Sequence, residues 1–294
     1  MTLLSTFGFH PQKRLEIVAP SRIQCSDISI VIPVQNNQKG INLFLTTFLQ
    51  THTPDMYPAE IIIIDNNSKP QITIPRQYCD IGLKITLLFC SDIGPACARN
   101  LGVRSTQSDW ILFTDSDCIP SSSFITGYFT ALNGSVGYAG NVKAWGSDSL
   151  SKYYESQEIL VPPLTAVNGE KRPEYLITAN ALVWKPAFEH IGGFNETITI
   201  AAGEDIDLGF RLREIGSLSA ALTSSVYHNF DDGIPGFCRR FVRYGKGNKI
   251  VSMLYHINLM PEAFNPKSHT LINRVLAKIQ YLCLLWGYVM NKSV

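Results

Sequence analysis

Short apolar segments, each about the length of a buried strand, alternate with segments of helical pattern in the first half of the chain. The four apolar segments are Ile28 to Val34, Glu60 to Ile64, Leu83 to Phe89 and Trp110 to Phe113. Helices are predicted between them, over residues 40–50 and after Gly94-Pro95, where proline suits the first turn. Strands that are buried on both faces and separated by helices form parallel sheets. The pattern therefore predicts a mostly parallel α/β sheet flanked by helices.

Beyond about residue 140 the alternation is less regular. Residues 149–159 and 203–216 have a helical pattern, whereas 175–184 and 219–227 resemble strands. The first 27 residues show no clear periodicity. We therefore expect three segments: an N-terminal extension over 1–27, an α/β domain over 28–250 and a C-terminal helical extension over 251–294.

The composition excludes several classes of protein. Hydrophobic residues make up 45% of the 294 residues and charged residues 17%, which argues for a packed core and against disorder. The 25 basic and 24 acidic residues leave a formal charge of +1, so we expect no nucleic-acid partner. The seven cysteines contain no C-x-x-C pair, and this odd, dispersed set favours reduced thiols in a cytoplasmic protein.

Neither end of the chain has the pattern of a secretory or membrane-spanning segment. Residues 1–9 are mildly apolar and lack the order of regions that defines a secretory signal. The uncharged residues 279–291 are fewer than the ~18–20 that a span requires. A helix packed on the domain is the first interpretation. The alternative is a peripheral helix at the inner face of a membrane, with Arg274 and Lys278 at the lipid surface.

Carboxylates follow two of the predicted strands. Asp65 comes at the end of the second strand, and Asp115 and Asp117 come directly after the fourth. The carboxyl ends of parallel strands meet at one edge of the sheet, where ligands of open α/β sheets bind. Two such carboxylates suit a hard divalent cation, Mg²⁺ or Mn²⁺, that bridges phosphate oxygens. The alternative is an Asx turn before Pro120.

A later helix opens with three acids. Glu204, Asp205 and Asp207 follow Gly203, and acids at a helix N-terminus interact favourably with the helix dipole. Asp207 can also pair with Arg211, one turn later. This explains Asp207 and part of Glu204. It leaves open whether Asp205 faces a cleft as a general base.

Two further features have both a structural and a functional interpretation. His228 is either an ordinary core or surface histidine or a neutral imidazole ligand of the same cation. The basic run from Arg239 to Gly247 is either the solvated face of a helix or a clamp for a diphosphate. In the second case its glycines would allow a mobile closing loop.

Taken in order, these motifs resemble glycosyltransferase family 2, inverting enzymes of the GT-A fold that use nucleotide-sugar donors. The resemblance covers about residues 28–250. Its motifs lie in 28–34, 60–68, 94–102, 113–117, 178–181 with 192–194, and the helix that begins with Glu204-Asp205. It implies a GT-A domain with a nucleotide-sugar-binding half over 28–140 and an acceptor-side half over 141–250.

The resemblance also implies roles for single residues. Donor-side residues would be Pro33, Val34, Asp65, Arg99, Asp115 and Lys246, the metal ligands Asp117 and His228, and acceptor-side residues Asn180 and Glu204. Asp205, rather than Glu204, takes the role of the general base that deprotonates the acceptor hydroxyl. A single displacement of this kind inverts the anomeric configuration.

The implied reaction is a metal-dependent transfer of one sugar, with Mn²⁺ or Mg²⁺, in glycan or glycolipid biosynthesis. The acceptor hydroxyl would belong to a saccharide, a lipid-linked glycan or a small molecule. A UDP-sugar is the favoured donor. GDP- and dTDP-sugars stay open as alternatives, because Gln35 and Asn66 depart from the family's usual residues near the base. No long transmembrane array follows the domain, which argues against a processive polymer synthase.

Two other functions remain open at this point. A sugar-1-phosphate nucleotidyltransferase shares the α/β core, but it would need a glycine-rich basic loop after the first strand, which Gln35 to Gln38 does not supply. A non-catalytic protein that binds nucleotide sugars could also have this fold. The candidate acids and His228 argue against that alternative without excluding it.

Overall fold

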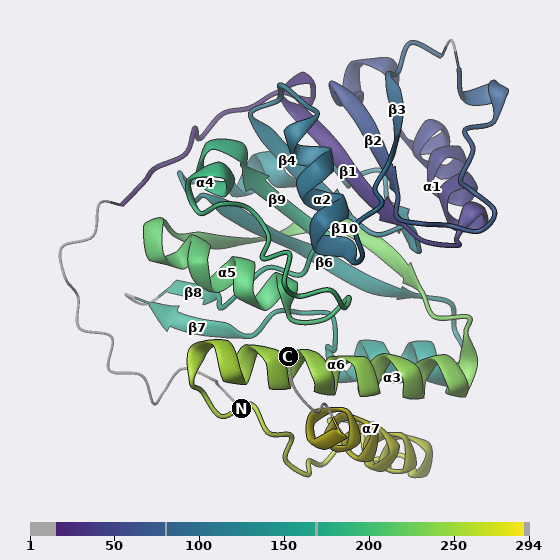
Figure 1. Cartoon of the computed structure of the whole chain (residues 1–294), viewed down its shortest axis with the longest axis vertical. Helices are drawn as coiled ribbons and strands as arrows, with labels where there is room; N and C mark the ends of the chain where they lie inside the picture. Colours follow the sequence, from purple (N-terminus) through teal and green to yellow (C-terminus); the bar gives the residue numbers. More distant parts are fainter. Residues whose placement is uncertain (1–15, 80, 168–169, 291–294) are drawn as a thin grey trace.

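The computed structural model describes residues 16–79, 81–167 and 170–290. At its centre is an eight-stranded sheet in the order β3-β2-β1-β4-β9-β6-β10-β5 (Figure 1). The strands are β1 Ile28–Val34, β2 Glu60–Asp65, β3 Ile85–Phe89, β4 Trp110–Thr114, β5 Cys118–Pro120, β6 Gly137–Trp145, β9 Asn180–Trp184 and β10 Leu218–Asn229. All of them except β5 and β9 run in one direction. The predicted mostly parallel α/β sheet is confirmed.

Helices cover both faces of this sheet. One face carries α1 (Gln38–Thr51), and the other carries α2 (Pro95–Arg104), α4 (Lys185–His190) and α5 (Glu204–Ile215). Strand β1 shows why both faces are covered. Its successive residues Ile30 and Val31 point to opposite faces, and each belongs to a different buried apolar cluster. Short 3-10 helices lie at Cys25–Asp27, Pro54–Met56, Arg76–Tyr78 and Thr126–Ala131.

A further group of helices lies beside the sheet (Figure 1). It comprises α3 (Ser149–Gln157), α6 (Gly233–Tyr255) and α7 (Leu271–Met290). Aromatic rings hold α3 against α6: Tyr154 stacks on Phe230, just before α6, and meets Phe237 edge to face. A small hairpin of β7 (Leu164–Val167) and β8 (Glu170–Pro173) was not predicted from the sequence.

The register of the strands brings the candidate residues to one edge of the sheet. Val34 pairs with Asp65 at the carboxyl ends of β1 and β2. β4 ends at Thr114, so Asp115 follows at the same edge. β10 is parallel to β6, and its His228 pairs with Cys118 at the start of the short β5. Residues distant in sequence therefore meet where ligands of such sheets bind.

The basic run near the C-terminus is helical, and the prediction of a mobile closing loop there is wrong. Residues 239–247 lie inside α6, which is continuous over 23 residues. The glycines serve close packing instead. A Cβ at Gly245 would lie 2.0 Å from the carbonyl oxygen of Leu284, and one at Gly287 would lie 2.0 Å from that of Val242. Only glycine therefore allows α6 and α7 to cross this closely.

Two predicted bounds also change. The strand predicted over 175–184 is confined to Asn180–Trp184, because a turn precedes it, in which the backbone N–H of Asn180 donates to Ile177 O at 3.0 Å. Residue 250, expected as a boundary, lies inside α6.

In the described part of the extension over residues 1–27, Ile17 and Ala19 donate backbone hydrogen bonds to Ile215 and Gly134 of the α/β domain. Within the described residues, no helix has both the length and the apolarity that crossing a membrane demands.

Candidate active site

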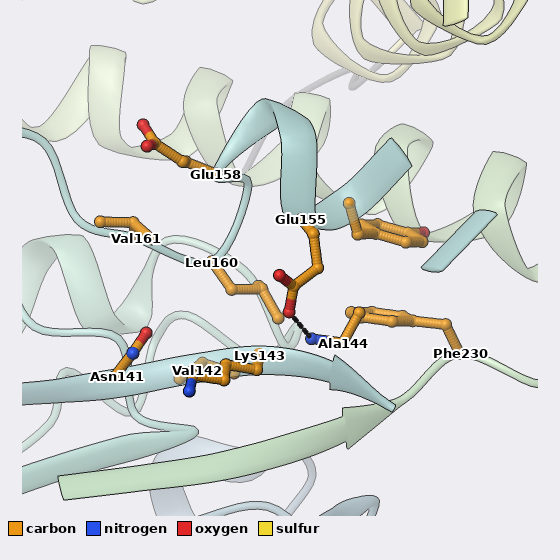
Figure 2. Close-up of a pocket in the computed structure, with 10 residues that line it drawn as sticks. Asn141, Val142, Lys143, Ala144, Glu155, Glu158, Leu160, Val161 and Phe230 are labelled. Carbon is orange, nitrogen blue, oxygen red and sulfur yellow. Dashed lines mark hydrogen bonds between the residues drawn. The ribbon is translucent and has the colours of Figure 1, made fainter. Parts of the chain in front are cut away.

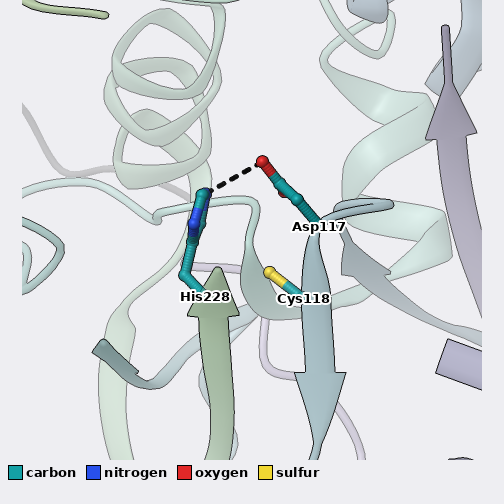
Figure 3. Close-up of side chains that lie close together, drawn as sticks. All are labelled: Asp117, Cys118 and His228. Atoms are coloured by element: carbon teal, nitrogen blue, oxygen red, sulfur yellow. Dashed lines mark ion pairs between the residues drawn. The ribbon is translucent and has the colours of Figure 1, made fainter. Parts of the chain in front are cut away.

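The closest approach between candidate metal ligands is that of Asp117 and His228 (Figure 3). The carboxylate Oδ2 of Asp117 lies 3.4 Å from Nε2 of His228. Two ligands of one ion, each about 2.1 Å from it, are separated by roughly 3.0–3.4 Å. The pair therefore fits a single divalent cation. The sequence predicted both residues, and the structure brings them together.

The ring of His228 is held by a hydrogen bond and by stacking on an aromatic ring. Its Nδ1 lies 3.1 Å from the carbonyl oxygen of Asn229, an acceptor, so Nδ1 carries the proton and Nε2 is left as the ligand atom. Phe230 stacks on the imidazole at 4.3 Å, and Tyr154 stacks on the other face of Phe230 at 3.7 Å. The guanidinium of Arg240 lies 4.9 Å from the Phe230 ring. Phe230 and Tyr154 form an aromatic column that orients the imidazole of His228.

Cys118 is a third group at the same place. Its Sγ and the ligand atoms of Asp117 and His228 lie within 4.8 Å of one another. Burial raises the pKa of the Cys118 thiol well above its ordinary value, and the charges of Asp117 and Asp115 add to the rise. The thiol is therefore neutral and a poor ligand for a hard cation. The sequence analysis did not single it out.

Arg99 joins the two acidic segments of the site. It is buried on α2, and its two terminal nitrogens donate to Asp115 Oδ1 at 2.7 Å and to Glu204 Oε1 at 2.9 Å. Glu204 is also buried, at the start of α5. Arg99 thus links the loop after β4 to the helix that carries Asp205.

Asp205 has a carboxylate whose pKa is raised at this edge of the sheet. Burial raises its pKa to about 7, the negative charge of Glu204 adds to the rise, and Arg99 opposes it. A carboxylate with a pKa near neutrality is suited to general base catalysis. Asp207, by contrast, accepts hydrogen bonds from Arg211 at 3.0 Å and from Tyr255 at 2.7 Å. Its structural pairing was predicted correctly.

The donor-side residues lie around the ends of β1 and β2. Pro33 and Val34 pair with Ile64 and Asp65. The two carboxylate oxygens of Asp65 accept backbone N–H groups of the loop after β2, from Ser68 at 2.8 Å and Ile72 at 2.9 Å. Asp65 therefore shapes this loop, and its contact with a base or ribose stays a prediction.

The unusual polar residues after these strands tie the edge together. Asn66 donates to the carbonyl oxygen of Cys90 and accepts from the N–H of Gly94, which fixes the entry to α2. Asn37 caps α1 and donates to the carbonyl oxygen of Ser116, between the two aspartates. Gln35, the other departure from the family pattern, donates to the carbonyl oxygen of Asn66 at 2.9 Å, so both departures support the loops that surround the site.

Comparison with known proteins identifies the family. A family model described as glycosyl transferase family 2 matches residues 29–192, more than half of the chain. The chain belongs to this family. It has the GT-A fold, as the resemblance implied.

Curated relatives agree with this assignment at low identity. A pre-mycofactocin glycosyltransferase of Mycobacterium tuberculosis is 27% identical over 213 residues, which cover 67% of this chain and 41% of the relative. A validoxylamine A glucosyltransferase of Streptomyces hygroscopicus is 26% identical over 64% of this chain and 48% of its own length. The chain thus spans less than half of these relatives.

Solved structures show the same fold. A mannosyltransferase from Pyrobaculum calidifontis superposes with a TM-score of 0.56 at 13% identity, over 94% of this chain and 76% of that one. The 1–349 segment of S. aureus TarS superposes with a TM-score of 0.52 at 15% identity, over 78% and 70%. At this identity the likeness concerns the fold alone.

Two residues expected on the acceptor side of the site make internal contacts. Asn180 is 1% exposed, and its amide bonds internally to Asn141 O at 3.1 Å and to the Tyr128 hydroxyl at 2.7 Å. Its amide therefore braces the strands around it, and its part on the acceptor side stays a prediction. Glu204 is buried and forms an ion pair with Arg99, and its part on the acceptor side likewise stays a prediction.

Lys246 lies on α6, where this helix passes the start of α5. The next residue, Gly247, is so close to Ala202 that a Cβ would lie 2.7 Å from the Ala202 side chain. Burial raises the pKa of the neighbouring Tyr244 to about 12, and the charge of Asp205 contributes to the rise. The helix therefore borders the candidate base, whereas a contact of Lys246 with a diphosphate stays a prediction.

A cavity of about 250 Å³ lies next to the aromatic column (Figure 2). Its walls come from the last part of β6, the end of α3 and Phe230. Lys143, Glu155 and Glu158 supply charged groups, and Glu155 accepts the backbone N–H of Ala144 at 2.9 Å. No sequence pattern predicts this cavity, because its walls are assembled from three separate segments.

Arg99→Met should lower the free energy of unfolding by about 3–5 kcal/mol, because it leaves the buried Glu204 carboxylate unpaired. Urea denaturation measures the change. Arg104→Met is the matched control, since Arg104 pairs with Glu196 at the surface and should cost no more than about 1 kcal/mol. Equal losses in the two variants would contradict the assigned role of Arg99.

Proposed function

We propose that this glycosyltransferase transfers a single sugar from a nucleoside diphosphate sugar to an acceptor hydroxyl, with inversion and with the help of Mn²⁺ or Mg²⁺. The observation that carries the proposal is the composition of one sheet edge. This edge holds the candidate metal ligands Asp117 and His228, and it also holds Asp205, whose pKa is about 7. The ion pairs of Arg99 with Asp115 and Glu204 connect the segments that carry these two groups.

The pair of Asp117 and His228 would hold the cation that neutralises the donor's diphosphate. A nucleoside diphosphate carries negative charge beside Asp115 and Asp117, and the groups repel one another in a partly buried site. A divalent cation held by Asp117 and His228 would offset this charge and that of the leaving group. Asp115 is already paired with Arg99, which leaves Asp117 as the carboxylate available to the ion.

Asp205 would deprotonate the acceptor hydroxyl. An alcohol is a weak nucleophile, and a single displacement needs a base on the side opposite the departing diphosphate. Asp205 would take the hydroxyl proton while the acceptor oxygen forms its bond to the anomeric carbon. One displacement at that carbon gives a product of inverted configuration.

The donor is proposed to be a UDP-sugar, with GDP- and dTDP-sugars as the alternatives. Similar structures hold donors of two of these classes. The Pyrobaculum mannosyltransferase was determined with GDP-Man and Mn²⁺, and TarS 1–349, with a TM-score of 0.51, in complex with UDP-GlcNAc. GalNAc-T7, with a TM-score of 0.51, was determined with UDP, GalNAc and Mn²⁺. These ligands support a nucleotide sugar and a divalent metal for this chain.

The experiment that tests this function is incubation with a panel of nucleotide sugars, with Mn²⁺ or with EDTA. Release of a nucleoside diphosphate that requires the metal is the expected result. Release of pyrophosphate would instead indicate a nucleotidyltransferase. Binding of a donor without release of either product, in the presence of candidate acceptors, would favour a non-catalytic protein.

The pH dependence of turnover should report Asp205. The base must be deprotonated, so activity should rise as the pH increases through about 7. Glu204→Gln removes a neighbouring negative charge that raises the pKa of Asp205, so the acidic limb should move to lower pH. A kcat/KM profile of both proteins measures this. An unchanged or upward-shifted limb in the variant would contradict the assignment.

A further inference from the structure

Helix α7 exposes a stripe of large apolar side chains on the face that points away from the domain. Its outer face presents Leu271, Val275, Leu282, Trp286 and Val289, which are 48% to 78% exposed. These residues recur at the spacing of one helical face. Such a stripe normally faces a core, so a different environment must match it here.

The inner face of α7 carries its buried polar residues. Asn273 and Gln280 are both buried, and Gln280 accepts a hydrogen bond from the hydroxyl of Tyr153 on α3 at 2.6 Å. On the same inner side, Gly287 packs directly on the backbone of α6. These contacts fix the rotation of α7 about its axis. The apolar stripe on the opposite face therefore points away from α3 and α6.

The two helices also have a one-sided charge. α6 and α7 together contain seven lysines and arginines and no aspartate or glutamate, although the whole chain is nearly neutral. Arg274 and Lys278 are exposed on α7 itself, at the border of the apolar stripe. Figure 1 shows α7 on the far side of α6 from the central sheet, at the periphery of the molecule.

We propose that the outer face of α7 docks on an anionic lipid surface, with the helix lying in the interface. The stripe of Leu282, Trp286 and Val289 would enter the headgroup region, and Arg274 and Lys278 would extend to the phosphates. Basic residues at such a surface are attracted to acidic lipids. This surface is independent of the transfer reaction proposed above.

A second copy of the chain is the less favourable occupant. In a symmetric dimer the patch packs on the same patch of a second copy, where α6 and α7 offer Arg274 and Lys278 no acidic partner. A lipid surface with acidic headgroups satisfies the apolar stripe and the basic border together. The charge pattern therefore favours a membrane surface.

Co-sedimentation with vesicles tests the proposal. The whole chain is mixed with phosphatidylcholine vesicles that contain or lack phosphatidylglycerol, at low and high salt. We expect the protein to pellet with the anionic vesicles and to be released by salt. Leu282→Glu combined with Trp286→Glu should reduce the partition coefficient at least about tenfold, because two apolar side chains leave the interface. Arg274→Gln with Lys278→Gln should remove the preference for acidic lipid.

Leu222→Glu is the matched control. Leu222 is a similarly exposed leucine, 59% accessible, but it lies on β10 rather than on α7, and its replacement should leave partitioning unchanged. The proposal is overturned if the wild-type chain stays in the supernatant with anionic vesicles, or if the control binds as weakly as the α7 variant. A dimer in light scattering that the α7 variant dissociates would assign the face to a second copy. No substrate is present, so the outcome does not depend on the proposed function.

Discussion

Replacing Asp205 with asparagine should reduce turnover by about 10²–10⁴-fold, the usual loss when a general base is removed. The change is nearly isosteric, so donor binding and the melting temperature should stay at wild-type values. The acidic limb of the pH profile near 7 should disappear as well, since the group that produces it is gone. Steady-state release of the nucleoside diphosphate, measured across pH, tests both expectations.

Glu189→Gln serves as the control for that variant. Glu189 is 60% exposed on α4 and pairs with Lys185 at the surface, so neutralising it removes the same charge without touching the site. Its turnover should be that of the wild type. The assignment of Asp205 fails if Asp205→Asn keeps more than about a tenth of the wild-type turnover while chemistry limits the rate.

Replacing Asp117 with alanine should abolish the part of nucleoside diphosphate binding that depends on Mn²⁺. The variant loses the carboxylate whose Oδ2 lies 3.4 Å from Nε2 of His228. His228 alone holds the ion poorly, because these cations prefer oxygen ligands. Titration calorimetry with UDP, in Mn²⁺ and in EDTA, should give equally weak binding for the variant under both conditions. The wild type should bind more tightly with the metal.

Asp231→Ala tests whether that loss is specific. Asp231 is an exposed carboxylate two residues beyond Asn229, so the control removes the same charge close to the same edge but not from the metal pair. Its binding should respond to Mn²⁺ as the wild type does. If Asp117→Ala keeps the full Mn²⁺ response, the ion is held elsewhere.

The convergence of Asp65 and residues 115–117 could be predicted from the sequence because it follows from topology, whereas the place of His228 beside Asp117 was implied by the family resemblance. Apolar runs that end in Asp65 and in the segment 115–117 indicate parallel strands whose carboxyl ends share an edge. The GT-A fold and the pairing of Asp207 with Arg211 were likewise predicted, and the structure confirms both. Local pattern suffices where neighbours in sequence, or a rule of chain direction, fix the geometry.

The direction of single side chains could not be predicted in this way. Glu204 and Asp205 are adjacent, and only the rotation of α5 decides that Glu204 meets Arg99, which is 105 residues away in sequence. Asn180 lies within a family motif, yet its amide turns inward because Tyr128 and Asn141 lie beside it. Such contacts join distant segments, and no local pattern encodes them.

The glycines of α6 are a second case in which local sequence does not predict the structure. Glycine inside a helix costs about 1 kcal/mol relative to alanine, so locally Gly245 and Gly247 favour a loop. Tertiary contact reverses this preference, because α7 and the start of α5 pack where a Cβ would stand. A helix therefore forms where local propensity alone predicts a flexible segment.

The anomeric configuration of the product tests the central claim most directly. Real-time proton NMR can follow the wild-type enzyme with an α-linked nucleotide sugar and Mn²⁺, with water as the acceptor, and observe the sugar before it mutarotates. A single displacement assisted by Asp205 predicts that the β-anomer forms first. Initial formation of the α-anomer would show retention and would contradict the proposed mechanism.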